Sequence, residues 1–287
     1  MRSAMSTRAS TRAGTAAASR MASTRGGTAS SSRPSTGDLE RRVEDTPLHD
    51  FAIPPLQIGD EAPNFSCDST VGLVTMHELV AGNWGLLLTF PRDFDPVGTT
   101  ELAMVSKLSD EFEARNIVVL GISPDSKTQH RMWIQETQEL QDCDITIPIL
   151  ADETGDVLLT YGLVRPDGVL AGPPGEGEDG AVEGEEEGNL QHIVDCSGVF
   201  LVDPDKRLRM IQLYPACAGR NFYEILRAID AIQLSTFHQV STPANWRQGE
   251  DVFIPVKITS TTANSMYPKG FLEIRNWFRL TPQPDLD

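Results

Sequence analysis

Short apolar runs alternate with segments of helical period between residues 56 and 235. Trp84–Phe90 and Ile117–Ile122 have the length and apolar density of buried strands. Between them, Asp95 and Pro96 form a helix start, in which a capping acid precedes proline at the first helical position. The helix predicted there carries on one face Val97, Leu102, Val105, Leu108 and Phe112. Strands that alternate with helices predict an α/β sheet.

The rest of the pattern extends this sheet and adds a smaller unit. Gly198–Val202 and Leu208–Tyr214 predict a hairpin around the turn at Asp203–Lys206. Residues after Thr236 predict a small β-rich unit. The other expected elements are helices at Met76–Val80, Ser126–Leu140 and Asp156–Gly162 and from Gly219 onward, and a strand at Ile145–Leu150.

The N-terminal segment has the opposite charge to the rest of the chain. Residues 1–37 hold six arginines and no acid, so the formal charge of −17 for the whole chain leaves −23 for the other 250 residues. Ser-Thr-Arg recurs at 6–8, 10–12 and 23–25. This low-complexity composition predicts a disordered tail over residues 1–50, because it offers little apolar area to bury. Two functional interpretations stay open, an organelle transit peptide and a tether to an acidic polymer that phosphorylation would release.

A second biased segment interrupts the sheet pattern at residues 165–191. Residues 173–187 hold seven acids and no base. The segment is predicted to be a solvated acidic insertion, and a site for a cation or a basic partner is the alternative. The acidic body argues against nucleic acid as a partner.

The four cysteines are Cys67, Cys143, Cys196 and Cys217. None has metal-ligand or Cys-x-x-Cys spacing, so we predict no metal, no cofactor and a reducing compartment. No apolar run approaches the 18 or so residues of a membrane span, so no span is predicted.

Residues 90–101 read Phe-Pro-Arg-Asp-Phe-Asp-Pro-Val-Gly-Thr-Thr-Glu. This run resembles the active-site loop of the one-cysteine peroxiredoxins, which reads approximately Pro-Arg-Asp-Phe-Thr-Pro-Val-Cys-Thr-Thr-Glu. Further matches in order and at family spacing are Leu213-Tyr-Pro215, Gly219-Arg-Asn-Phe222, Trp246, Pro268-Lys-Gly270 and Thr281-Pro-Gln-Pro284. The resemblance spans Leu56–Pro284. It implies a thioredoxin-like peroxiredoxin domain at 51–235, a peroxiredoxin C-terminal domain at 236–287, and a homodimer.

The same resemblance places the family's reactive groups on this sequence. Pro91 and Arg220 match the family, but Asp95 stands where it has threonine, Gly98 where it has the peroxide-reducing cysteine, and Ser197 where it has arginine. Covalent catalysis requires its nucleophile, so these positions predict a degenerate site with no catalytic residue. We expect Arg220 to pair with Asp95 as a structural ion pair. Glycine costs about 1 kcal/mol relative to alanine in a helix. At position 98 it fits a site that no longer has to present a side chain, and relief of crowding in the turn is a second expectation.

A phospholipid-hydrolysing triad has also been attached to this subfamily. His77 and Asp205 match its positions, but Asn83 stands where the nucleophilic serine belongs. His77 is therefore predicted to be a packing or capping residue. Cys217 lies in a loop that approaches the site in the family, and it is predicted to be a small buried apolar residue. Cys196 is expected to point away from the site, because successive strand residues face opposite ways.

The function predicted from the sequence is that of a non-catalytic, peroxiredoxin-like scaffold. Its basic residues 1–37 would attach it to an acidic assembly such as a microtubule, in the cytoplasm or the axoneme of a cilium or flagellum. A mitochondrial or other organelle location is the alternative, if those residues are a transit peptide. The alternative function is that of a thiol peroxidase which reduces hydroperoxides through a displaced cysteine.

Overall fold

The computed structural model describes residues 56–163 and 196–285, so the predicted tail 1–50 and acidic insertion 165–191 lie outside the described residues. In this part of the chain seven strands form one sheet, in the order β2-β1-β5-β4-β3-β6-β7. The strands are β1 (Ser66–Ser69), β2 (Gly72–Thr75), β3 (Trp84–Thr89), β4 (Ile117–Ser123), β5 (Ile149–Ala151), β6 (Cys196–Val202) and β7 (Leu208–Pro215).

β3 lies inside the sheet, and all six of its residues are buried. It pairs in parallel with β4 and antiparallel with β6, with Leu87 opposite both Leu120 and Phe200. A strand covered on both faces carries mostly apolar residues, which explains the apolar run, and the buried hydroxyl of Thr89 at its end has a hydrogen-bond partner. Because β3 and β4 are parallel, their carboxyl ends meet at one edge of the sheet, and the candidate site forms there.

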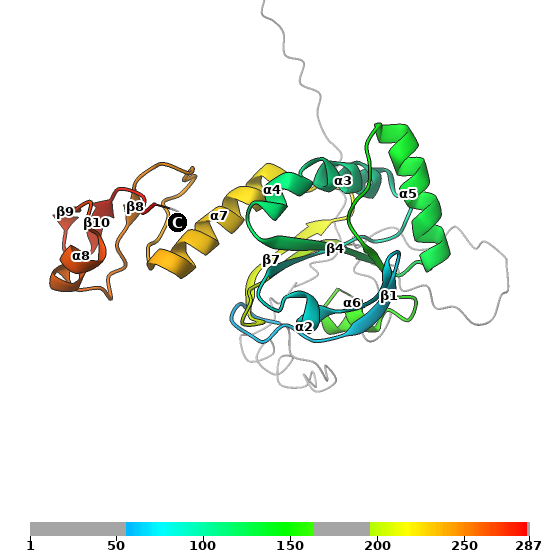
Figure 1. Cartoon of the computed structure of the whole chain (residues 1–287), viewed down its shortest axis with the longest axis horizontal. Helices are drawn as coiled ribbons and strands as arrows, with labels where there is room; N and C mark the ends of the chain where they lie inside the picture. The colour runs from blue at the N-terminus through cyan, green and yellow to red at the C-terminus, as the bar shows by residue number, and fades with distance from the viewer. Residues whose placement is uncertain (1–55, 164–195, 286–287) are drawn as a thin grey trace, which may run out of the picture. The chain divides into compact units, whose positions relative to one another are not determined.

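Helices cover both faces of the sheet (Figure 1). They are α2 (Met76–Leu79), α3 (Pro96–Lys107), α4 (Ser109–Glu113), α5 (Lys127–Gln141), α6 (Asp156–Thr160) and α7 (Phe222–His238). Leu102 of α3, Trp133 of α5 and Ile225 of α7 belong to one buried cluster. Met76 and Leu158, from α2 and α6, belong to the cluster on the opposite face. The predicted alternation of strands and helices is therefore confirmed as an α/β sandwich.

The helix predicted from Pro96 through Phe112 is two helices. Leu108 has φ −102° and ψ 14°, which are not α-helical values, and it separates α3 from α4. Its N–H is shared between the carbonyls of Met104 and Val105, at 3.1 and 3.2 Å. Phe112 is nevertheless buried. The apolar pattern thus located the buried face correctly but could not show the break, because the contacts of one buried face do not require one continuous axis.

The strand predicted at Ile145–Leu150 is shorter than expected and begins later, because β5 contains only Ile149–Ala151. Pro148 precedes it and has no N–H to donate to a neighbouring strand, although its carbonyl accepts the Gly121 N–H at 2.9 Å. Regular pairing therefore begins only after the proline.

The residues after α7 form a small unit with β8 (Val252–Phe253), α8 (Ser260–Met266), β9 (Leu272–Arg275) and β10 (Phe278–Thr281). Its three strands are ordered β8-β10-β9. Trp246 is 1% exposed within its core, and the indole N–H donates to the Glu250 carbonyl at 3.0 Å. The boundary predicted after residue 235 falls inside α7, and the unit contains a helix as well as strands. None of the described helices is long and apolar enough to cross a membrane.

Candidate functional site

The start of α3 is fixed by Asp95. Its Oδ2 accepts the backbone N–H of Gly98 at 2.7 Å, and its backbone oxygen accepts the N–H of Thr99 at 2.8 Å. The carboxylate therefore satisfies one of the N–H groups that a helix leaves without an internal partner, and it lies at the positive end of the helix dipole. The N-terminus of α3, which is a natural anion site, already holds an anion of its own chain.

Gly98 is buried in the first turn of α3. A Cβ atom placed there would lie 3.4 Å from Cδ1 of Phe90, 3.5 Å from Oδ2 of Asp95 and 3.7 Å from Cζ2 of Trp133. These are ordinary van der Waals distances, and the residue does not have a positive φ. The expectation that glycine relieves crowding is therefore wrong, since the position has room for at least a methyl group.

The predicted ion pair between Arg220 and Asp95 is also wrong. The guanidinium Nη2 of Arg220 lies 2.6 Å from Oε2 of Glu101, and the backbone N–H of Arg220 donates to Oε1 at 2.7 Å. Both side chains are almost completely buried. A buried guanidinium needs a carboxylate that is buried with it, and Asp95 already caps α3.

Further contacts hold the Arg220 guanidinium in place. Nη1 donates to the Gly198 carbonyl at 3.0 Å, and the guanidinium carbon lies 4.7 Å from the centre of the Phe90 ring. Nε is buried and has no hydrogen-bond partner among the described residues. The positive charge of Arg220 is thus neutralised by Glu101, the last residue of the motif at 90–101.

Ser197 is 3% exposed on β6, opposite Tyr214 of β7. Its neighbour Gly198 donates its N–H to Thr89 Oγ1 at 2.7 Å, which ties β6 to the end of β3. Cys196 packs against the cluster on the other face of the sheet from Trp133 and Phe90. The expectation that Cys196 points away from the site is therefore confirmed.

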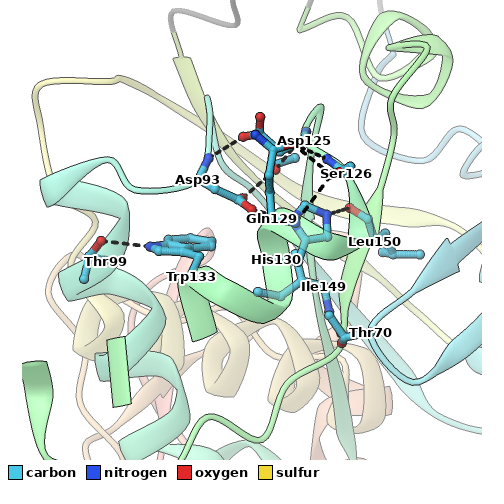
Figure 2. Close-up of polar contacts among 11 residues, drawn as sticks. Thr70, Asp93, Thr99, Asp125, Ser126, Gln129, His130, Trp133, Ile149 and Leu150 are labelled. Atoms are coloured by element: carbon cyan, nitrogen blue, oxygen red, sulfur yellow. Dashed lines mark hydrogen bonds and ion pairs between the residues drawn. The ribbon is translucent and has the colours of Figure 1, made fainter. Parts of the chain in front are cut away.

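A buried polar network fixes the loop between β3 and α3 (Figure 2). Asp93 accepts from the Ser123 hydroxyl at 2.8 Å, and its other carboxylate oxygen lies 2.6 Å from Nδ1 of His130. Nε2 of His130 lies 3.0 Å from the Leu150 carbonyl oxygen, which can only accept, so Nε2 carries a proton.

Asp125 completes this network. Its Oδ2 accepts the backbone N–H of Asp93 at 2.5 Å. Burial raises the pKa of the Asp125 carboxyl, and the nearby charge of Asp93 adds to the effect. The network ties the loop before α3 to the β4–α5 connection. Sequence reasoning missed it because Asp93 and His130 are 37 positions apart and carry no local signal.

The described cysteines differ in accessibility. Cys67 is buried, its thiol donates to the Ala151 carbonyl at 3.3 Å, and burial raises its pKa to about 11. Such a thiol is unreactive near neutral pH. Cys217 is exposed in the turn after β7, so the prediction that it is buried is wrong. Two residues further on, a Cβ at Gly219 would lie 3.6 Å from Val97, so this turn packs against the start of α3.

His77 has a structural role, as predicted. One ring nitrogen, Nε2, lies 2.7 Å from the Ala62 carbonyl oxygen, and its backbone N–H donates to Asn64. Asn83 donates to the Leu79 carbonyl. Among the described contacts of His77, none joins it to Asn83 or Asp205.

Family models match most of the described chain. The model of the AhpC/TSA family matches residues 58–211, and that of the C-terminal domain of 1-Cys peroxiredoxin matches residues 231–270. The 1-Cys peroxiredoxin of Dictyostelium discoideum is 37% identical over 230 residues, which are 80% of this chain and 86% of the relative. Peroxiredoxin-6 of Rattus norvegicus is 35% identical over 80% of this chain and 98% of its own length.

Solved structures of peroxiredoxins superpose on most of this chain. A yeast mitochondrial 1-Cys peroxiredoxin superposes with a TM-score of 0.67 at 35% identity, over 79% of this chain and 99% of its own. A cysteine-to-serine mutant of the peroxiredoxin 6 of Arenicola marina superposes with a TM-score of 0.67 at 33% identity, over 80% and 100%. The predicted thioredoxin-like fold is therefore confirmed.

Proposed function

The chain belongs to the 1-Cys peroxiredoxin family, and we propose that it works as a non-catalytic binding protein built on that fold. The observation that carries the proposal is the geometry of Gly98, whose N–H is held by Asp95 at the N-terminus of α3. Peroxide reduction needs a thiolate that becomes a sulfenic acid, and glycine offers no atom for that step.

The surrounding charges support the same conclusion. A thiolate at position 98 would start from a Cβ only 3.5 Å from the Asp95 carboxylate, and a second negative charge raises a thiol pKa. The N–H that would stabilise the thiolate is already used. Arg220 is paired with Glu101, and Ser197 supplies no charge. The charge of Asp95 and the uncharged side chain of Ser197 thus both disfavour the ancestral chemistry.

Binding through a second copy and through the tail is part of the proposal. β7 is an edge strand of the sheet, and its Leu213 is 57% exposed, which favours a homodimer across this edge. The proposed attachment of residues 1–37 to an acidic polymer such as a microtubule rests on their six arginines alone. Co-sedimentation of the full chain with microtubules, and its loss when residues 1–40 are removed, tests that part.

A displaced cysteine is the second candidate, because the exposed Cys217 lies in a turn that packs against the start of α3. The decisive experiment measures hydrogen peroxide consumption by the purified full chain with a thiol reductant. We expect no turnover above that of the Cys217→Ser variant. The variant Asp95→Thr/Gly98→Cys/Ser197→Arg, checked for folding by circular dichroism, is expected to gain turnover. Turnover by the unaltered chain that is lost in Cys217→Ser would establish the second candidate instead.

A further inference from the structure

A groove of about 860 Å³ runs beside the first turn of α3 and the second half of α5. We propose that it binds a peptide segment of a partner protein in which arginine or lysine adjoins apolar side chains. The residues that carry this proposal are Phe94, Pro96, Glu136, Thr137, Glu139 and Leu140. The volume is in the range of ordinary ligand sites. The groove does not include Gly98, so the proposal stands or falls independently of the proposed loss of peroxidase activity.

The electrostatics of the groove favour a cation. Glu136 and Glu139 are exposed, and neither carboxylate has an ion-pair partner within residues 56–163 and 196–285. The last turn of α5 contains no basic residue to offset the negative end of the helix dipole. Lys107 donates to the Gln141 carbonyl at 3.0 Å at the end of the helix, and so satisfies only one of these carbonyls.

Two exposed apolar side chains line the groove, and a bound peptide would cover them. Leu140 is 73% exposed and Phe94 is 43% exposed. Phe94 has a φ of 58°, a left-handed conformation that is uncommon for a residue with a bulky side chain. Exposed apolar side chains beside carboxylates suit a peptide whose aliphatic or aromatic groups adjoin its cations.

Thr137 supplies an independent sign of a missing partner. Its side chain is fully buried, and its hydroxyl oxygen has no hydrogen-bond partner among the described residues. The residue lines the groove close to Trp133, whose indole N–H is already used by Thr99 at 2.9 Å. A buried hydroxyl without a partner is unfavourable, so a ligand that supplies a donor or acceptor here gains affinity.

The test is fluorescence anisotropy of the full chain with a labelled synthetic peptide of arginine, leucine and glycine. A second peptide with glutamine in place of each arginine is the probe control. We expect the arginine peptide to bind, and Glu136→Gln/Glu139→Gln to weaken it about tenfold. The matched variant Asp110→Asn/Glu113→Gln removes the same charge from exposed positions of α4 and is expected to change the affinity less than about twofold.

Thr137→Val measures the contribution of the hydroxyl to peptide affinity independently of the two glutamate charges. It keeps the shape of the side chain, so the fold should be at least as stable, while the affinity should fall about threefold. Equal weakening by the two double variants, or equal binding of the arginine and glutamine peptides, would overturn the proposal. So would a dimer of the peptide-free chain that dissociates in Glu136→Gln/Glu139→Gln, because the groove would then belong to a second copy.

Discussion

The Asp95 carboxylate lies 2.7 Å from the Gly98 N–H, at the helix terminus where the family places its thiolate. One side chain thus supplies a helix cap and, with it, the negative charge that occupies the anion site. An aspartate cap at position 95 and the absence of a thiol at position 98 are therefore compatible with each other. A capping carboxylate would oppose a thiolate in the same turn.

Removing this cap should destabilise the protein. We expect Asp95→Ala to lower the free energy of unfolding by about 1 kcal/mol, since the Gly98 N–H loses its acceptor. Asp95→Asn keeps an acceptor and should cost less. Urea denaturation of the two variants beside the unaltered chain measures the difference. Equal stability of all three would show that the cap contributes nothing.

Two buried glycines should respond in opposite ways to alanine. Gly98→Ala is expected to stabilise the protein by about 0.5–1 kcal/mol, because the helix gains propensity and the Cβ meets only ordinary contacts. Gly198→Ala should destabilise it, because its Cβ would lie 2.7 Å from the Phe200 ring. Thermal unfolding of both variants beside the unaltered chain measures the two changes in stability. A loss of stability in Gly98→Ala would mean that the turn requires glycine.

The Arg220–Glu101 pair should be the most sensitive polar contact near the site. Arg220→Ala leaves a buried carboxylate without its cation and is expected to cost about 3–5 kcal/mol. Arg227→Ala, which breaks the exposed pair with Glu224, is the control and should cost about 0.5 kcal/mol or less. Chemical denaturation compares them. An unchanged free energy of unfolding in Arg220→Ala would contradict the structural role.

The raised pKa of Asp125 predicts a pH dependence of stability. A carboxyl group whose pKa is higher in the folded state binds more protons there, so its contribution becomes less favourable as pH rises from the unfolded pKa through the folded one. Asp125→Asn keeps an oxygen for the Asp93 N–H and removes the charge. It should therefore stabilise the protein more at pH 7 than at pH 4, relative to the unaltered chain. Urea denaturation of both proteins at pH 7 and at pH 4 measures this stabilisation. A larger stabilisation at pH 4 than at pH 7 would refute the prediction.

Thiol labelling should follow burial. At pH 8, N-ethylmaleimide is expected to modify the exposed Cys217 quickly, whereas Cys67 should react only after unfolding, since it is buried and its pKa is about 11. Peptide mass spectrometry over a time course identifies each site. Early labelling of Cys67 in the folded chain would contradict the packing described around it.

Local rules were enough to predict the layered α/β fold and the places where α3 and β3 lie. A mostly apolar run at Trp84–Phe90 predicts a strand buried on both faces, and Asp95-Pro96 predicts a helix start. The identity of the residues at 95, 98 and 197 was also available from the motif. The spacing of apolar residues and a helix-capping signal depend only on residues close together in the chain. A single sequence is therefore enough to predict the elements that they mark.

The partners of the buried charges, by contrast, could be identified only in the folded chain. Arg220 pairs with Glu101, 119 positions away, and His130 pairs with Asp93 across 37 positions. The sequence predicted Asp95 for the arginine, because charge alone cannot rank two nearby carboxylates. Which one is chosen depends on burial, on the direction of each side chain and on hydrogen bonds already made, and these quantities exist only once the chain has folded.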